Sequence, residues 1–363
     1  MTLRMDDPTQ WSPPQSGEEL GRRIHAGREL RQLDLSGRDF RGLAGGGAVF
    51  HEVDFTGTNL DGADLREAAF VGCKLDGASL VEANLHQATL MKCSLERADL
   101  QRARLTGTKI YEAQAGGLDL RAADLRTTVF SKCALGGARM VAAKLVRCAF
   151  LECTLEGADV RNTPLDSVTL LGVDLREVLV EGASFERVTL IKANLAGMHL
   201  AGMCLVQSQL TEADLSGCDL RGADLTGAGL TGANLGEAVL AEATAPNALF
   251  VGANLSKADL RKTKLRQALF VDAVLEQARC VAADMVQCIL HRAKCGEAVF
   301  SGADLTYADF SEADIHACDF TGAKMFRANL HAVDDRDAVI PNRSVTLGTD
   351  PELAAAQRWR PKL

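Results

Sequence analysis

The chain has 363 residues, with 48 acidic and 40 basic side chains and a formal net charge of −8. This mixed, mildly acidic composition lacks the basic patch of a direct nucleic-acid binder and the basic amphipathic segment of a membrane-surface protein. There is no apolar run long enough to span a bilayer and no apolar core of a secretory signal, so the eleven cysteines indicate reduced thiols in the cytoplasm.

The first predicted element is a short helix over residues 17–26. Ser16 followed three residues later by Glu19 is a capping-box pattern at its start. Leu20 and Ile24 then share one helix face, because residues four apart are neighbours on a helix. We expect this face to cover the first turn of the segment that follows.

A five-residue repeat dominates the chain from Leu30 to Leu330. Every fifth residue in this range is apolar, except Gly45, and a small residue usually lies two positions before this central residue. A helix would rotate an apolar stripe of this period around its axis, and a flat strand would flip it between faces. The conflict disappears if the chain turns a corner every five residues, with the central and small residues inside and glycine favoured at the corners.

Four such sides would complete one turn of the chain. Phenylalanine recurs at central positions, and cysteine at small inward positions, in steps that are multiples of 20. These residues are Phe50, Phe70, Phe130, Phe150, Phe250, Phe270 and Phe310, and Cys73, Cys93, Cys133 and Cys153. We therefore expect an all-β, four-sided parallel solenoid of about 15 turns. Weaker turns are expected near Gly45–Gly47, Gln114–Gly117 and Ala245–Asn247.

The repeat resembles that of the pentapeptide-repeat family, written A(D/N)LXX. The match is clearest at Ala63-Asp64-Leu65, Ala213-Asp214-Leu215, Ala223-Asp224-Leu225 and Ala303-Asp304-Leu305. The resemblance implies a right-handed quadrilateral β-helix with short capping segments at both ends. We assign residues 1–29 to an N-terminal tail and capping helix, 30–330 to the β-helix, and 331–363 to a C-terminal tail with a short helix.

The last predicted element is the helix of this C-terminal tail. Asp350 followed by Pro351 can start it, since proline is favoured at the first helical position, and it can run to about Trp359. The segment 331–349 that precedes the helix is expected to be irregular.

The repeats offer no evident catalytic, cofactor or metal site. Most cysteines occupy inward small positions without a CxxC pair, the histidines are scattered, and most acidic residues occupy outward positions. Distance leaves open a disulfide between stacked cysteines such as Cys73 and Cys93, but a reducing compartment disfavours it. We expect a protein that is not an enzyme and needs no cofactor or metal.

An apolar stripe marks one outer face of the predicted solenoid. The residue after each central position points outward, and on the phenylalanine-rich side it is mostly apolar. This predicted stripe, here called the apolar column, consists of Val71, Met91, Tyr111, Leu151, Leu171, Ile191, Val251 and Val271. It is a candidate interaction surface, although the β-propensity of such residues on a flat ladder explains it equally well.

An acidic segment forms a second candidate surface. Residues 296–320 contain no Lys or Arg, and Asp304, Asp309, Asp314 and Asp319 follow one another at five-residue steps. This acidic belt is expected to encircle one turn. Some pentapeptide-repeat proteins protect DNA gyrase and are thought to mimic DNA, but a DNA mimic needs charges along its length rather than around it.

The leading interpretation is a non-enzymatic protein-binding scaffold or adaptor whose partner the sequence does not identify. The family resemblance implies that a homodimer can form through terminal helices, where Trp359 is a candidate contact. One alternative is a DNA-mimic protector or inhibitor of DNA gyrase or topoisomerase. Another, by analogy alone, is an adaptor or effector accessory associated with a type VI secretion system. Direct binding to nucleic acid or to a membrane is not expected.

Overall fold

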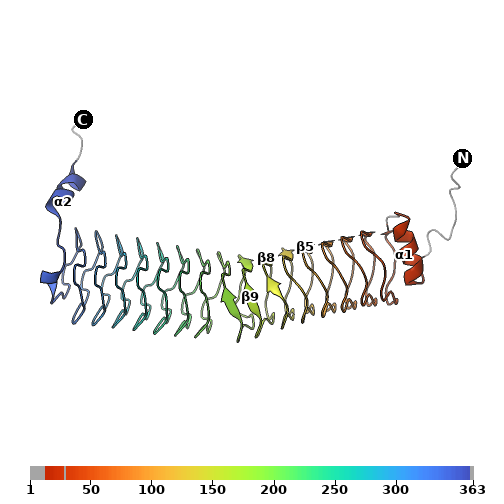
Figure 1. Ribbon diagram of the computed structural model, residues 1–363, viewed down its shortest axis with the longest axis horizontal. Helices are drawn as coiled ribbons and strands as arrows, with labels where there is room; N and C mark the ends of the chain where they lie inside the picture. Colours follow the sequence, from red (N-terminus) through yellow and green to blue (C-terminus); the bar gives the residue numbers. More distant parts are fainter. Residues whose placement is uncertain (1–12, 28–29, 360–363) are drawn as a thin grey trace. The chain divides into compact units, whose positions relative to one another are not determined.

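The structure, a computed structural model, describes residues 13–27 and 30–359 in two compact units that divide between Ala183 and Ser184. Residues 1–12, 28–29 and 360–363 of the predicted terminal segments lie outside the described residues. Each unit is built from stacked turns of parallel β-structure, drawn from red to green for the first unit and from green to blue for the second (Figure 1).

The first unit consists of a short helix and a stack of strands. Helix α1 (Gly17–His25) comes first. Eight strands then form one parallel sheet, in the order β1 (Leu30–Arg31), β2 (Val49–His51), β3 (Ala69–Val71), β4 (Thr89–Met91), β5 (Lys109–Tyr111), β6 (Val129–Ser131), β8 (Ala149–Leu151) and β10 (Thr169–Leu171). On another face, β7 (Leu145–Val146) pairs with β9 (Pro164–Asp166).

Neighbouring turns pair in one constant register on four separate columns. The first pairs of these columns are Asp34 with Asp54, Asp39 with Asn59, Ala44 with Asp64, and Leu30 with Phe50. Four paired columns in each turn make the solenoid four-sided and parallel. The fold class expected from the five-residue repeat is therefore confirmed.

The second unit keeps the same register with less regular pairing. It opens with β11 (Ser184–Glu186), continues through isolated bridges such as Gln209 with Gly229, and ends in a 3₁₀ turn η2 (Arg343–Val345) and helix α2 (Pro351–Arg358). The longest sheet accounts for about eight turns, fewer than the 15 expected from the sequence. Beyond Glu186, neighbouring turns pair through single bridges rather than strands.

The core is a stack of central residues. Phe50 and Phe70 are fully buried, and their rings stack at a centroid distance of 4.9 Å. Phe130 with Phe150, and Phe250 with Phe270, stack in the same way at 5.0 and 4.8 Å. The exception to the apolar pattern is Gly45, where an added Cβ would lie 2.9 Å from Leu65 Cδ2, so the neighbouring leucine already fills the space.

The corners explain why the chain can turn every five residues. Residues 32–337 are all described, and every fifth residue from Gln32 to Asp337 has a positive φ, except Glu177. This left-handed conformation is open to glycine at no steric cost, and other residues adopt it at a cost. Glycine is therefore common at the corners, but most corners are formed by other residues that the ladder holds in place.

The three turns expected to be weak have intact ladders. Gly45 N–H donates to the Asp64 carbonyl at 2.7 Å, Gly117 N–H to Gly136 at 2.8 Å, and Ala245 N–H to Lys264 at 2.7 Å. That prediction was wrong because the pairing groups are backbone atoms, which glycine and alanine supply as well as any residue.

Both helices begin at the capping residues that the sequence indicates. The Ser16 hydroxyl accepts from Glu19 N–H at the start of α1, and the Asp350 carboxylate accepts from Glu352 and Leu353 N–H at the start of α2. Leu20 is fully buried, which agrees with a helix that covers the first turn. The segment 331–349 is more ordered than expected, because bridges at Asp334 and Val339 continue the ladder.

Candidate functional site

The strand register gathers one part of the apolar column on the sheet of the first unit. Val71, Met91 and Tyr111 are Cα partners in β3, β4 and β5, and the register continues through Ser131 to Leu151 and Leu171 in β8 and β10. Because neighbouring strands lie about 4.8 Å apart, the five steps from Val71 to Leu171 span about 24 Å. These apolar side chains therefore form one line, which is interrupted only by the polar side chain of Ser131.

The exposure of this line is moderate. Met91 is 39% exposed, and Val71, Tyr111, Leu151 and Leu171 are half-buried. Half-buried apolar residues on a flat ladder present their outer surface while their sides pack on neighbours. The first-unit part of the column can therefore take up a partner's apolar side chains without any change of fold.

The other three residues of the predicted column, Ile191, Val251 and Val271, belong to the second unit, where they do not form a continuous line. Thr211 and Thr231 occupy the turns between Ile191 and Val251, so the eight residues do not form one line within a unit. Val251 and Val271 instead lie in successive turns. They flank a short apolar ladder of outward residues before the central positions, made of Leu249, Leu269 and Ile289, which the sequence pattern also assigns to this face.

The structure reveals a charged motif that the sequence analysis missed. The tripeptide Asp-x-Arg occurs nine times, and each time the arginine forms an ion pair with the aspartate two residues earlier. In eight of them the middle residue is a buried apolar central residue, so both charged side chains emerge on the same outer face. The recurrence of Asp-x-Arg in the sequence could have predicted these ion pairs.

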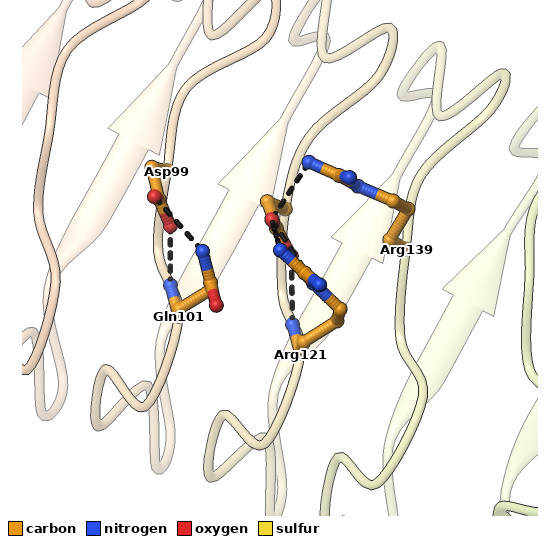
Figure 2. Close-up of polar contacts among 5 residues, drawn as sticks. Asp99, Gln101, Arg121 and Arg139 are labelled. Atoms are coloured by element: carbon orange, nitrogen blue, oxygen red, sulfur yellow. Dashed lines mark hydrogen bonds and ion pairs between the residues drawn. The ribbon is translucent and has the colours of Figure 1, made fainter.

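The most buried of these pairs is centred on Asp119, whose side chain is only 4% exposed. Arg121 donates to its carboxylate from Nε and Nη2, and Arg139 of the next turn donates at 2.7 Å (Figure 2). In the preceding turn the carboxylate of Asp99 accepts from the backbone and side chain of Gln101 instead (Figure 2). The charges of Arg121 and Arg139 are therefore paired within the protein.

These contacts hold the carboxylates in their charged form. Burial alone would raise the pKa of Asp119, but hydrogen bonds from Arg121 and the charges of Arg139 and Arg121 outweigh it and lower the pKa. The side-chain hydrogen bond of Arg221 lowers the pKa of Asp219 to about 2. Such neutralised pairs add little net negative charge to the surface.

The acidic belt lies around one turn of the second unit. Asp304, Asp309, Asp314 and Asp319 pair with four different columns, through bridges to Asp284, Ile289, Lys294 and Val299. None of the four has an arginine two residues later. Among side chains, their hydrogen-bond partners include Lys324, Asn329, His316 and Ser301 in turn. The belt is thus negative, but its carboxylates face four directions.

The C-terminal helix is tied to the second unit through His331. The buried His331 accepts from Asp350 N–H at Nδ1, so its other nitrogen, Nε2, is the donor to Gln357 Oε1 at 3.0 Å. Gln357 in turn donates to Glu312 at 2.8 Å. Trp359, the candidate dimer contact, follows α2 and is 72% exposed.

A hollow of about 800 Å³ lies between α1 and the first turn, lined by residues that include Arg22, His25, Asp39 and Arg41. It is wide open and mixes both signs of charge.

In the described part of the chain, no three His, Cys, Asp or Glu side chains are placed to hold a metal ion. Neither of the α-helices described here has the length and apolar character needed to cross a bilayer.

The geometry defines a parallel β-solenoid with four sides and five residues per side. A family model described as a pentapeptide repeat region matches residues 48–120, and a second, described as pentapeptide repeats, matches residues 29–66 and a series of overlapping segments from 204 to 331. The chain belongs to the pentapeptide-repeat family.

Several solved structures resemble the chain, whereas no curated protein matches it. A trypsin-treated form of QnrB1, a plasmid-mediated fluoroquinolone resistance protein, is 25% identical, covers 53% of this chain and 90% of its own, and has a TM-score of 0.37. HetL, a pentapeptide repeat protein involved in heterocyst differentiation regulation in the cyanobacterium Nostoc sp. strain PCC 7120, is 22% identical, with coverages of 90% and 98% and a TM-score of 0.21. At these TM-scores, neither resemblance bears on function.

Proposed function

We propose that this chain is a non-enzymatic scaffold that binds a protein partner through the apolar column of its first unit. One observation supports the proposal above all: Val71, Met91, Tyr111, Leu151 and Leu171 lie in register on a single parallel sheet. A rigid ladder of this kind fixes its side chains before binding, so little conformational entropy is lost when a partner docks.

The column has the dimensions of the centre of an interface. A line about 24 Å long and about 10 Å wide covers roughly 240 Å², whereas a stable interface buries about 800 Å² on each partner. The apolar line therefore supplies the buried centre, and polar neighbours such as Lys92, Lys109 and Glu112 supply the rim.

The charges of the first unit favour binding through the apolar column over DNA mimicry. Six of its carboxylates, from Asp39 to Asp174, are each neutralised by the arginine of an Asp-x-Arg motif. A DNA mimic needs uncompensated negative charge in a line, as on the phosphate backbone. A cytoplasmic location agrees with the eleven cysteines, all of which are free thiols in the structure.

The test compares three purified baits in a bacterial lysate: the natural chain, the double variant Leu151→Lys with Leu171→Lys, and the control Val81→Lys with Val141→Lys. The control places the same change at half-buried valines on another face. We expect a partner that the natural chain and the control retain and the column variant loses. Equal recovery of the partner by all three baits would exclude the apolar column as its binding site. Recovery of gyrase by all three would favour the DNA-mimic alternative.

A further inference from the structure

One face of the first unit contains a break in the backbone ladder. Leu135 N–H donates to the Thr154 carbonyl at 2.9 Å, and Thr154 N–H donates to the Cys133 carbonyl at 3.1 Å. One turn later, the N–H of Leu155 has no backbone acceptor among the described residues. Thr154 bridges back to Ala134, but no bridge within the described chain continues this column from Thr154 to the following turn. The ladder is therefore open beside Leu155.

The corner beside the break is displaced by one residue. Gly137 N–H donates to the Glu156 carbonyl at 2.8 Å, whereas Gly157 N–H donates at 3.1 Å to the carbonyl of Glu177 and not to that of Arg176, its equivalent in the register. Glu177 is also the corner that lacks a positive φ between residues 32 and 337. The hydrogen bond at this corner is thus displaced by one residue, and the usual register returns at Val160, whose N–H donates to the Leu179 carbonyl at 3.0 Å.

Three consecutive inward positions beside the break are occupied by valine. The small inward position, usually alanine elsewhere, is occupied here by Val168, Val173 and Val178. Val173 follows Cys153 one turn later in the same column. We attribute the break to the run of three valines, which adds two methyl groups to the core at each position, because overpacked cores relieve strain by shifting the backbone.

A cavity of about 380 Å³ opens at the break, and Cys153 is among its lining residues. Seven of the eight cysteines at small inward positions donate their thiol to a carbonyl 23 residues earlier, as Cys133 does to Ile110 at 3.3 Å. Cys153 is the exception, since the one backbone carbonyl its thiol reaches among the described residues is that of Leu151, at 3.5 Å. Cys153 thus lines the cavity and lacks the bond to the preceding turn that holds the other seven thiols.

The neighbour of Cys153 in the column is Cys133, one turn away. Neighbouring turns lie about 4.8 Å apart, within the Cα separation of about 4.4–6.8 Å that a disulfide spans. The neighbouring Cys153 thiol lowers the pKa of Cys133 to about 7, and Cys133 raises the pKa of Cys153, whereas burial raises the pKa of the unpaired Cys148 to about 12. The pair therefore loses a first proton more readily than a single buried thiol does.

We propose that Cys133 and Cys153 form a peroxide-sensitive dithiol that closes to a disulfide between two turns of the solenoid. After the first proton is lost, transfer of the remaining proton from Cys153 to Cys133 gives the thiolate of Cys153, a residue that lines the cavity. This thiolate attacks one oxygen of hydrogen peroxide and breaks the O–O bond. This step gives Cys153 sulfenic acid and releases hydroxide, which takes up a proton to become water. The Cys133 thiol then attacks the Cys153 sulfur, forms the S–S bond and displaces the second water. Overall, two thiols and one hydrogen peroxide give one disulfide and two waters.

Cys73 and Cys93 form a built-in control pair. They occupy the same column one turn apart, and each alters the pKa of the other in the same direction as in the first pair, lowered at Cys73 and raised at Cys93. Their ladder is closed. Leu75 N–H donates to the Ser94 carbonyl at 2.7 Å, and Ser94 N–H donates to the Cys73 carbonyl at 3.0 Å. One turn later, Leu95 N–H donates to the Gln114 carbonyl at 2.6 Å. Both thiols also keep their bonds to the carbonyls 23 residues earlier. The two pairs differ in access rather than in spacing.

The first experiment exposes the folded protein to limiting hydrogen peroxide, blocks the remaining thiols, and maps disulfides by peptide mass spectrometry. We expect the Cys133–Cys153 disulfide to form at least tenfold faster than the Cys73–Cys93 disulfide, and dithiothreitol to reverse it. Equal rates for the two pairs, or no disulfide at Cys153, would overturn the proposal.

Three variants test the role of the break. Cys133→Ser removes the second thiol, so a dimedone probe should trap sulfenic acid at Cys153. Val173→Ala removes the overfilling beside Cys153 and should slow disulfide formation at least fivefold, while the control Val168→Ala, in a neighbouring column of the same turn, should leave the rate unchanged. A Val173→Ala protein that remains folded by circular dichroism and reacts at the natural rate would contradict the proposal.

Discussion

The guanidinium of Arg121 donates to the carboxylate of Asp119 at 3.0 and 2.8 Å from a position only two residues further along the chain. The geometry follows from the repeat, because the residue between them points inward and both charged side chains emerge on one face. The five-residue period thus sets the pairing of surface charges as well as the core.

Replacement of Asp119 by asparagine should destabilise the first unit. The change leaves the guanidinium groups of Arg121 and Arg139 facing a neutral amide at a site where the carboxylate is 4% exposed, which costs about 1–3 kcal/mol. Urea unfolding measures the loss. The control Asp39→Asn breaks the same motif where the carboxylate is 54% exposed, and should give no measurable change.

Stability should fall in acid because of the same motif. The pKa of Asp219 is lowered to about 2 in the folded chain, against about 3.9 in an unfolded one. Its contribution, of the order of 1 kcal/mol after solvent screening, is therefore present above pH 4 and is lost as the pH falls from 4 to 2. Thermal unfolding followed from pH 6 to pH 2 should show this loss, and Asp219→Asn should reduce the slope. An unchanged slope in the variant would contradict the assignment.

Hydrogen exchange should locate the ladder break. The amide of Leu155 lacks the inter-turn bond that the amide of Leu135 makes to Thr154. We expect the Leu155 amide to exchange at least tenfold faster, measured by residue-resolved hydrogen exchange. Equal protection of the two amides would show that the turns are joined in solution.

The N-terminal helix should act as a cap. Leu20 is the fully buried leucine of α1, so Leu20→Ala should cost about 2–4 kcal/mol and expose the first turn of the ladder. Chemical unfolding and light scattering test the two effects. Glu18→Ala, at an exposed position of the same helix, serves as the control and should change neither.

Much of the fold could be predicted from sequence because one period encodes it. The spacing of Phe50 and Phe70 indicated the length of a turn, and Ser16 and Asp350 marked both helix starts. The break at Val173 was missed although its signal is present, in valines at positions where alanine is usual. Attention to glycine-rich turns pointed to the wrong places, because the ladder there is held by backbone groups that glycine also supplies.

The apolar column could be predicted only in part. Inward and outward positions follow from the repeat, so Val71 and Leu171 were assigned to one face, as their strand register bears out. The division of the chain into two units has no counterpart in the period, so the sequence could not separate Ile191 from the first-unit residues. The identity of the partner is not encoded in the repeat either.

The most direct test of the proposed scaffold is a titration of the recovered partner against the natural chain and the Leu151→Lys, Leu171→Lys variant, at low and high salt. We expect the variant to bind at least tenfold more weakly, and raising the salt from 50 to 500 mM to change the natural affinity by less than about threefold, because apolar contacts are not screened. Equal affinities for the two proteins, together with a steep loss of binding in salt, would contradict the scaffold proposal.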